Sequence, residues 1–221
     1  MRCFIIKSLA LGTLMILAAS LSGCSVNPAT GRTQLDILSR TDEIRLGAEA
    51  APQLTKEMGG EVKDAQLRAY VKEIGDRLAA VTEGDFPSLP WEFTLLDSDV
   101  VNAFALPGGK IFMSRGLAQR MTNEAQLAGV LGHEVGHVTA RHITEQMSRS
   151  GIASLIIGTG ATVLSDGSSA SAEQMSQIGQ QVGGVILMKY GRDQESEADY
   201  LGMRYMSRIG YNPAAQRQVM E

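Results

Sequence analysis

The spacing of apolar residues along the chain predicts several amphipathic helices. Apolar positions recur every three or four residues over 41–58 and 61–81, which is the repeat of one helix face. Gly59-Gly60 separates the two stretches and marks a break between them. The periodicity predicts further helices over residues 122–149, 173–190 and 193–209, with Gly210 as the cap of the last.

Three short segments between the helices favour β-strands. Residues 91–96 (WEFTLL) and 100–105 carry aromatic and β-branched side chains, and residues 110–113 follow as a return strand. The turn Leu106-Pro107-Gly108-Gly109 has Pro and Gly where a tight turn needs them. We therefore expect an α+β fold, mostly helical, with a small antiparallel sheet beside the helix over 122–149.

The stretch that follows this long helix differs in composition from its neighbours. Residues 152–164 are apolar or small, but the run is too short to cross a bilayer as a helix. Residues 165–172 are rich in Ser and Gly, so we expect a loop there. This composition leads to the hypothesis that residues 158–172 form a lid over the active-site cleft. The last predicted helix begins at Asn212-Pro213 and stops abruptly at Glu221, as expected of a fragment or a truncated gene product.

The N-terminus has the organisation of a bacterial lipoprotein signal peptide. Residues 1–7 carry two positive charges, and residues 8–20 form an apolar run too short for a membrane span. Leu21-Ser22-Gly23-Cys24 then resembles the lipobox, in which the Cys receives a diacylglyceryl group. A plain secretory signal or an uncleaved N-terminal anchor is the alternative interpretation.

The lipobox interpretation sets the expected domain boundaries. The signal peptide is expected over residues 1–23, a polar tether over 24–34 and one folded domain over 35–221. The lipid on Cys24 would attach the chain to a membrane of the bacterial cell envelope. An Asp after that Cys is the usual signal for retention in the inner membrane. Ser25 stands there instead, which predicts the outer membrane, facing the periplasm.

Composition narrows the classes of function. The chain has 221 residues, of which 44% are hydrophobic and 20% charged, as in an ordinary globular domain. A formal net charge of -4 does not suggest a nucleic-acid partner, which would favour a basic face. The two cysteines are Cys3, inside the expected signal peptide, and Cys24, the expected lipid attachment point. The mature domain would therefore offer no cysteine ligand to a metal.

The strongest chemical signal is the HExxH motif formed by His133, Glu134 and His137. Residues four apart on an α-helix differ by about 400°, so both imidazoles leave the same face and can bind one Zn2+ ion. Glu134 lies one step round the helix, where a general base can reach a water molecule on that ion. The alternative is a pair of surface histidines on an ordinary helix.

The third protein ligand must come from another part of the chain. His142 lies nine residues after His133, half a turn out of phase, so we expect it to face away from the metal. Glu145 is too far along the same helix. A metzincin would place a Gly and a third His at Ala140 and Ile143, so that pattern is excluded. With no cysteine available, a distant carboxylate is expected.

The best candidate for this carboxylate lies near residue 195. Glu195 and Asp199 are four residues apart and share a helix face, whereas Glu197 is about 200° away from Glu195 and should point elsewhere. Glu195 would bind the ion, and Asp199 would accept a hydrogen bond from a ligand histidine and fix its tautomer. The alternative is a solvated acidic face paired with Arg192 and Arg204.

Together these motifs resemble the zinc peptidases that include HtpX, the CAAX prenyl endopeptidases and BepA. The likeness covers about residues 35–221 and rests on the segments 102–109, 131–138 with Arg141-His142, 195–199 with Gly202, and 210–213. The resemblance implies a zincin-like fold of the gluzincin type. It also implies one Zn2+ held by His133, His137 and Glu195, with Glu134 as general base and Asp199 behind the ligands.

The expected function follows from this resemblance and from the N-terminus. We expect a zinc-dependent endopeptidase of the cell envelope that acts on misfolded or unassembled envelope proteins, as part of protein quality control. The alternatives are a chaperone or assembly factor for outer-membrane proteins, with secondary or regulated protease activity, and a metal enzyme that is not a peptidase.

Two further roles are assigned within this expected site. The strand over 100–105, with Asn102, Ala103 and Phe104, is expected to pair with an extended substrate, unless it is an ordinary hairpin strand. The donor that stabilises the oxyanion is left open among Tyr190, Arg192, Tyr200, Arg204 and Tyr205.

Overall fold

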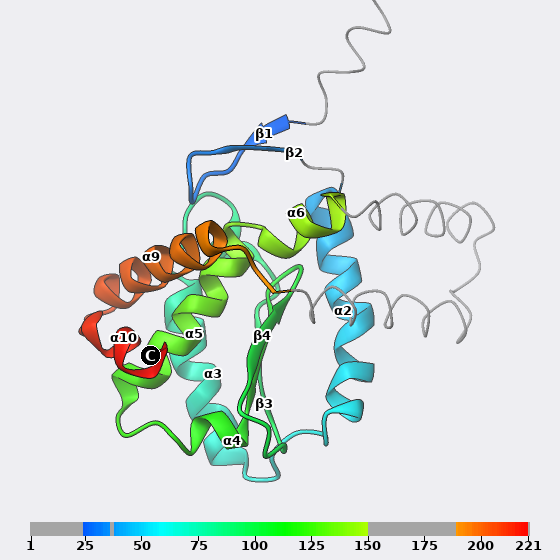
Figure 1. The fold of residues 1–221 in the computed structure, drawn as a ribbon. Coiled ribbons are helices and arrows are strands. Elements are labelled where there is room, and N and C mark those ends of the chain that lie inside the picture. Colours follow the sequence, from blue (N-terminus) through cyan, green and yellow to red (C-terminus); the bar gives the residue numbers. More distant parts are fainter. Residues whose placement is uncertain (1–23, 36–37, 150–188, 221) are drawn as a thin grey trace, which may run out of the picture.

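The computed structural model describes residues 24–35, 38–149 and 189–220. The predictions for the signal peptide (1–23), the lid (158–172) and almost all of the helix over 173–190 lie outside these residues. Within them, the prediction of an α+β fold, mostly helical with a small sheet, is confirmed (Figure 1).

The described helices are α2 (Arg40–Glu57), α3 (Ala65–Ala79), the short 3-10 turn η1 (Phe86–Ser88), α4 (Arg115–Ala118), α5 (Glu124–Thr139), α6 (His142–Arg149), α9 (Arg192–Arg208) and α10 (Ala214–Met220). The described strands are β1 (Cys24–Val26), β2 (Thr33–Leu35), β3 (Glu92–Leu96), β4 (Ala103–Leu106) and β5 (Lys110–Ser114). The second predicted helix starts later than expected, at Ala65. The Asp64 side chain caps α3 by accepting from the backbone N–H groups of Gln66 and Leu67.

The main sheet has the order β3-β5-β4. Strands β4 and β5 form the expected antiparallel hairpin, and its turn uses Gly108 and Gly109 at positive φ. Strand β3 instead runs parallel to β5, because the chain crosses from β3 to β4 before the hairpin begins. This order makes β4 an edge strand, with no partner strand on its outer side among the described residues.

The sheet separates two apolar clusters. One face, which includes Phe93, Ile111 and Met113, packs against α3 and α5. The other face, which includes Phe104 and Phe112, packs against α2 and α6. Figure 1 shows this layering, with α2 on one side of the strands and α3 and α5 on the other. The alternation along each strand therefore buries both faces of the sheet.

The prediction of one helix over 122–149 is wrong: the chain breaks between α5 and α6. Arg141 has a φ of 60°, a conformation that ends a regular helix. Its guanidinium donates to the buried carboxylate of Glu43, over 2.8 Å, and to the carbonyl oxygen of Leu38, over 2.9 Å. These contacts with α2 and with Leu38, two residues before its start, hold Arg141 and redirect the residues that follow.

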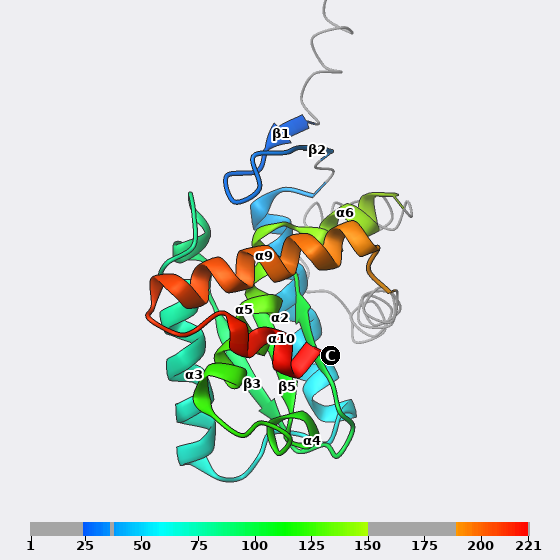
Figure 2. The same cartoon turned by 60° about the vertical axis from the view of Figure 1, so that its left-hand side comes forward.

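Helix α9 crosses α5 at very close range. A Cβ added to Gly136 would lie 2.7 Å from the carbonyl oxygen of Ala198, and one added to Gly202 would lie 2.8 Å from the backbone nitrogen of His133. Both are shorter than real carbon contacts, so only glycine fits at these positions. Figure 2 shows α9 lying across α5 with α10 beside them. This contact brings the acidic side chains of α9 to the histidines of α5.

Residues 24–34, expected as a polar tether, pair as a short hairpin that docks on the domain. Strands β1 and β2 are antiparallel, with Val26 opposite Thr33. Asn27, Ala29 and Gln34 are buried against the end of α5 and its surroundings. The segment is therefore packed rather than extended. Within the described ranges, no helix has both the length and the apolar character needed to cross a bilayer.

Candidate metal centre

The two histidines of the HExxH motif lie side by side on the buried face of α5. His133 is 4% exposed and His137 is 2% exposed, and their Nε2 atoms are 2.9 Å apart. The helical spacing of four residues produces this arrangement, as predicted from the sequence. Each ring turns its Nε2 atom towards the other and its Nδ1 atom towards the protein.

Helix α9 places Glu195 at the same point. One carboxylate oxygen lies 3.4 Å from Nε2 of His133, and the other lies 3.9 Å from Nε2 of His137. The donor atoms of the three residues all fall within 4.8 Å of one another. Ligands held at 2.0–2.1 Å around a tetrahedral ion lie about 3.4 Å apart. The three predicted ligands therefore meet with spacings close to those of a metal site.

The Nδ1 atom of His133 has a fixed partner. It lies 2.8 Å from Oδ1 of Asp199, which also accepts a hydrogen bond from Nε2 of Gln216 over 2.9 Å. The bond to His133 lowers the pKa of Asp199 below its ordinary value, so the carboxyl is ionised and accepts the proton of Nδ1. Asp199 thus lies where the sequence predicted it, behind a ligand histidine.

The Nδ1 atom of His137 also has a partner, which the sequence analysis missed. It lies 2.9 Å from Nδ1 of the fully buried His142. On its other side, Nε2 of His142 lies 3.0 Å from Oε2 of Glu197. His142 does not face the candidate metal position, as expected, but its ring contacts the candidate ligand His137. The break at Arg141 brings its ring there.

The short distance between the two Nε2 atoms suits a cation between His133 and His137. With both Nδ1 atoms protonated, a neutral pair of rings would point two lone pairs at each other across 2.9 Å. A proton or a metal ion between the two Nε2 atoms would relieve this repulsion. Burial alone would lower the pKa of His133, but the bonds to Asp199 and Glu195 outweigh it and raise the pKa to about 10. A divalent metal would replace this proton.

Glu134 lies beside the candidate ligands and is buried, with 7% of its surface exposed. Burial raises its pKa to about 7, partly offset by the nearby charge of His133. A carboxyl group with this pKa can both accept and return a proton near neutral pH.

A cleft with a volume of about 470 Å³ opens onto these residues. It is lined by Asn102, Ala103, Phe104, Ala105, His133, Glu134, His137, Lys189, Tyr190 and Glu195. The residues expected to bind the substrate backbone thus form one wall, although the observed strand β4 starts only at Ala103 and Asn102 lies just before it. The Tyr190 ring stacks on His137, with 3.9 Å between the ring centroids and 20° between the planes.

Tyr190 is the one candidate oxyanion donor that lines this cleft. Tyr205 is fully buried and bonds to Thr139 and Glu83. Arg204 donates to the carbonyl oxygen of Ala29 and pairs with Glu83. Tyr200 and Arg192 lie on exposed parts of α9 and do not line the cleft.

Comparisons with known proteins agree with this geometry. Residues 65–220 match the family described as Peptidase family M48. The mitochondrial metalloendopeptidase OMA1 of Schizosaccharomyces pombe is 30% identical over 196 residues, which cover 88% of this chain and 56% of that protein. The beta-barrel assembly-enhancing protease of Escherichia coli K12 is 30% identical over 199 residues, covering 88% of this chain and 40% of that protein. The chain thus spans about half the length of these relatives.

Proposed function

Because this chain belongs to peptidase family M48, we propose that it is a zinc-dependent endopeptidase of the bacterial cell envelope. Its substrates are unfolded or misassembled envelope proteins, and a lipid on Cys24 attaches it to the membrane. One observation carries the proposal: His133, His137 and Glu195 converge within 4.8 Å beside Glu134, at the floor of an open cleft.

The donor set suits zinc. Two imidazole nitrogens and one carboxylate oxygen are the ligands of many catalytic zinc sites, which keep a fourth position for water. A bound zinc ion would lower the pKa of that water and polarise the scissile carbonyl group. Asp199 and His142 hold the two ligand rings with their Nε2 lone pairs directed inward.

Glu134 acts as the general base. Its carboxylate takes the proton of the attacking water and later delivers it to the nitrogen of the leaving amine. Glu134 lines the same cleft as the three candidate ligands, where the water and the scissile bond would lie. Tyr190, at the rim beside His137, is placed to donate to the developing oxyanion.

The substrate binds along β4. Its outer edge carries no strand among the described residues, and Asn102, Ala103 and Phe104 line the cleft directly above Glu134 and His137. An extended peptide would add to this edge through backbone hydrogen bonds, a mode that tolerates many side chains. Such tolerance fits unfolded proteins, whose backbone is accessible, better than folded ones.

The envelope location is supported by the N-terminal sequence and by relatives. The lipobox Leu21-Ser22-Gly23-Cys24 provides an anchor, and Ser25 directs it to the outer membrane. Relatives from Escherichia coli and Yersinia pestis are named beta-barrel assembly-enhancing proteases, and barrels of this type are proteins of the outer membrane. A protease beside that membrane would meet unassembled barrels.

Casein cleavage by the purified full chain tests the activity. We expect zinc-dependent cleavage that stops on addition of a chelator and returns with zinc. Glu134→Gln should retain zinc, because the ligands are unchanged, but should cleave nothing. Cleavage by a zinc-loaded Glu134→Gln sample would exclude Glu134 as the base. Suppression of aggregation without cleavage by the parent chain would instead support the chaperone alternative.

A further inference from the structure

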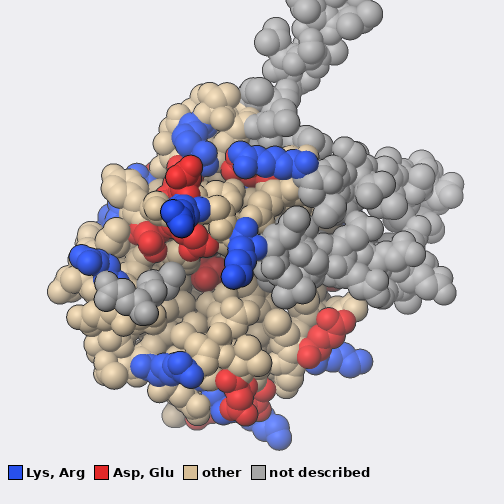
Figure 3. All heavy atoms as spheres, in the orientation of Figure 1, with Lys and Arg blue, Asp and Glu red and all other residues tan. Residues whose placement is uncertain are grey.

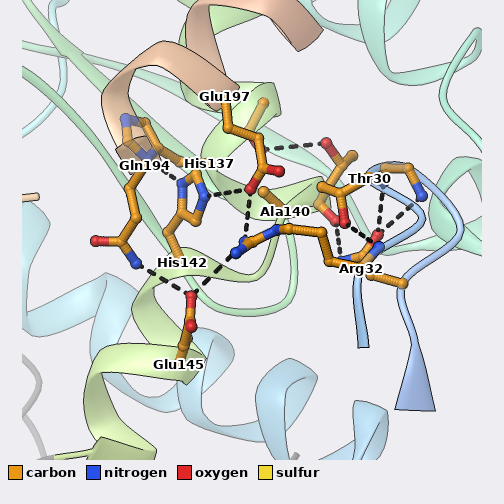
Figure 4. A network of polar contacts seen from close by, with 12 residues as sticks. Thr30, Arg32, His137, Ala140, His142, Glu145, Gln194 and Glu197 are labelled. Carbon is orange, nitrogen blue, oxygen red and sulfur yellow. Dashed lines mark hydrogen bonds and ion pairs between the residues drawn. The ribbon is translucent and has the colours of Figure 1, made fainter. Parts of the chain in front are cut away.

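A line of polar contacts runs from His137 to the N-terminal hairpin. Nδ1 of His137 lies 2.9 Å from Nδ1 of His142, whose Nε2 lies 3.0 Å from Oε2 of Glu197. The same carboxylate oxygen accepts from Nη2 of Arg32 over 2.6 Å. Figure 4 shows the four side chains in sequence, contributed by α5, α6, α9 and the β1–β2 hairpin.

We propose that His142 and Glu197 are positioning residues that orient the metal ligand His137, and that Arg32 of the hairpin holds Glu197 in place. The inference rests on the proposed metal site. It adds Glu197 to Asp199 as a second carboxylate behind the ligand histidines. It also makes the β1–β2 hairpin, which begins at Cys24, part of the site.

The direction of every hydrogen bond in the line is determined. Arg32 can only donate and the Glu197 carboxylate can only accept, so Nε2 of His142 must carry the proton that faces Glu197. A neutral His142 then has a bare Nδ1, which accepts from Nδ1–H of His137. This leaves the Nε2 lone pair of His137 free for the metal. The reverse arrangement would need a charged His142, which complete burial of the ring disfavours.

The two ligand histidines are supported in parallel ways. His133 donates directly to Asp199, whereas His137 reaches Glu197 through one intervening ring. Both carboxylates come from α9, as does the candidate ligand Glu195. Glu197 points to the other side of the helix from Glu195, as the turn of about 200° over two residues requires. Helix α9 thus carries the candidate third ligand, Glu195, and both supporting carboxylates, Glu197 and Asp199.

The hairpin is fixed at the same place by two buried side chains. Nδ2 of Asn27 donates to the carbonyl oxygen of Thr139 over 2.8 Å, and Nε2 of Gln34 donates to that of Ala140 over 2.7 Å. These carbonyls lie at the C-terminal end of α5, where helix carbonyls lack partners within the helix. The hairpin therefore caps α5 and places Arg32 beside Glu197.

Charges of both signs gather where α9 passes the hairpin (Figure 3). Glu145 belongs to this group: it lies 3.8 Å from Arg32 and accepts from Gln194, but unlike Glu197 it is not hydrogen-bonded to the His142 ring in Figure 4. Neutralising Glu145 changes the local charge as much as neutralising Glu197 does. Glu145→Gln is therefore a matched control for the proposed contact.

The test compares zinc affinity by competition with a chromophoric chelator, using the full chain in detergent. Losing a partner behind a ligand histidine typically costs about 10–100-fold in metal affinity. We expect a loss in this range for Glu197→Gln, a smaller one for Arg32→Gln, recovery in Arg32→Lys, and an unchanged affinity in Glu145→Gln. The visible spectrum of the Co2+-loaded chain should shift in Glu197→Gln and not in Glu145→Gln.

Parent-like zinc affinity and an unshifted Co2+ spectrum in Glu197→Gln would overturn the proposal. If Glu197→Gln fails to fold, the comparison of Arg32→Gln with Arg32→Lys tests the proposal instead. Arg32 is 44% exposed, so its replacement opens no core cavity. A parent chain that binds zinc but cleaves no casein would refute the proposed function, while the affinity comparison would still decide this inference. A parent chain that binds no zinc would refute both.

Discussion

Asp199 lies directly behind His133: its Oδ1 atom is 2.8 Å from Nδ1 of the ring and 2.9 Å from Nε2 of Gln216. Gln216 belongs to α10, so three helices meet at this carboxylate. The contact fixes the tautomer in which Nε2 of His133 is a lone-pair donor. Helix α10 thereby contributes to the candidate metal centre although it provides no ligand.

Asp199→Asn should weaken zinc binding by about 10-fold, because a neutral amide polarises the His133 ring less than a carboxylate does. Competition with a chelator measures the change. Asp193→Asn, with the same loss of charge in the first turn of α9, is the control and should bind zinc like the parent. Equal affinities in the two variants would contradict the role given to Asp199.

Gly136→Ala should destabilise the domain and disturb the candidate site together. The added methyl group would lie 2.7 Å from the carbonyl oxygen of Ala198, so α9 must move away from α5. Overpacking of this kind costs about 1–3 kcal/mol, measurable by urea unfolding of the metal-free chain. Gly191→Ala, which meets open space at the N-cap of α9, should cost less, about 0.5 kcal/mol, because Ala is a poorer N-cap than Gly. A zinc affinity unchanged in Gly136→Ala would show that α9 tolerates the shift.

Much of the candidate site followed from helical periodicity. A spacing of four residues places His133 with His137, and Glu195 with Asp199, and this depends on local geometry alone. Helices α2, α3 and α9 and the β4–β5 hairpin followed from equally local signals. The sequence therefore predicted two pairs of residues. The preference of zinc for nitrogen and oxygen ligands suggested that the two pairs meet in the fold.

The support of His137 could not be predicted in the same way. It depends on the break at Arg141, and that break depends on Glu43, which is 98 residues away in the chain. Treating residues 122–149 as one helix gave no reason to expect the His142 ring against Nδ1 of His137. The pairing of Arg32 with Glu197, across 165 residues, has no local signal either. A polar stretch after a lipobox suggests an extended tether. In the structure this stretch is packed on the domain, with Asn27 and Gln34 buried.

Glu43→Gln should cost about 3 kcal/mol of unfolding free energy. The carboxylate is 3% exposed and accepts from Arg141 over 2.8 Å, so its loss leaves a buried guanidinium without its charged partner. Urea unfolding measures the cost. Glu49→Gln removes one of two half-buried acidic partners of Arg45 on the same helix, leaving Asp42, and should change stability by less than about 0.5 kcal/mol. A Glu43→Gln variant as stable as Glu49→Gln would exclude the buried pair as the cause of the α5–α6 break.

Tyr190→Phe should lower kcat by about 10²-fold with little change in KM, because a hydroxyl that donates to the oxyanion acts in the transition state. Stacking on His137 would persist in the Phe variant, since the ring is retained. Tyr200→Phe, on the exposed side of α9, should behave like the parent. Casein turnover at several substrate concentrations separates the two parameters. A raised KM with an unchanged kcat would assign Tyr190 to substrate binding instead.

Cys24→Ala should release the protein from the membrane. Cys24 begins β1, so a lipid on this residue would hold the membrane next to the hairpin that caps α5. In cells fed labelled palmitate, the parent should carry label and sediment with membranes, whereas Cys24→Ala should do neither. Cys3→Ala is the matched control, because Cys3 lies in the segment expected to be removed and should leave labelling intact. Label retained in Cys24→Ala, or lost in Cys3→Ala, would refute lipidation at Cys24. Since the hairpin also presents Arg32 to Glu197, an unlabelled Cys24→Ala chain should still bind zinc like the parent, because none of these contacts involves the lipid.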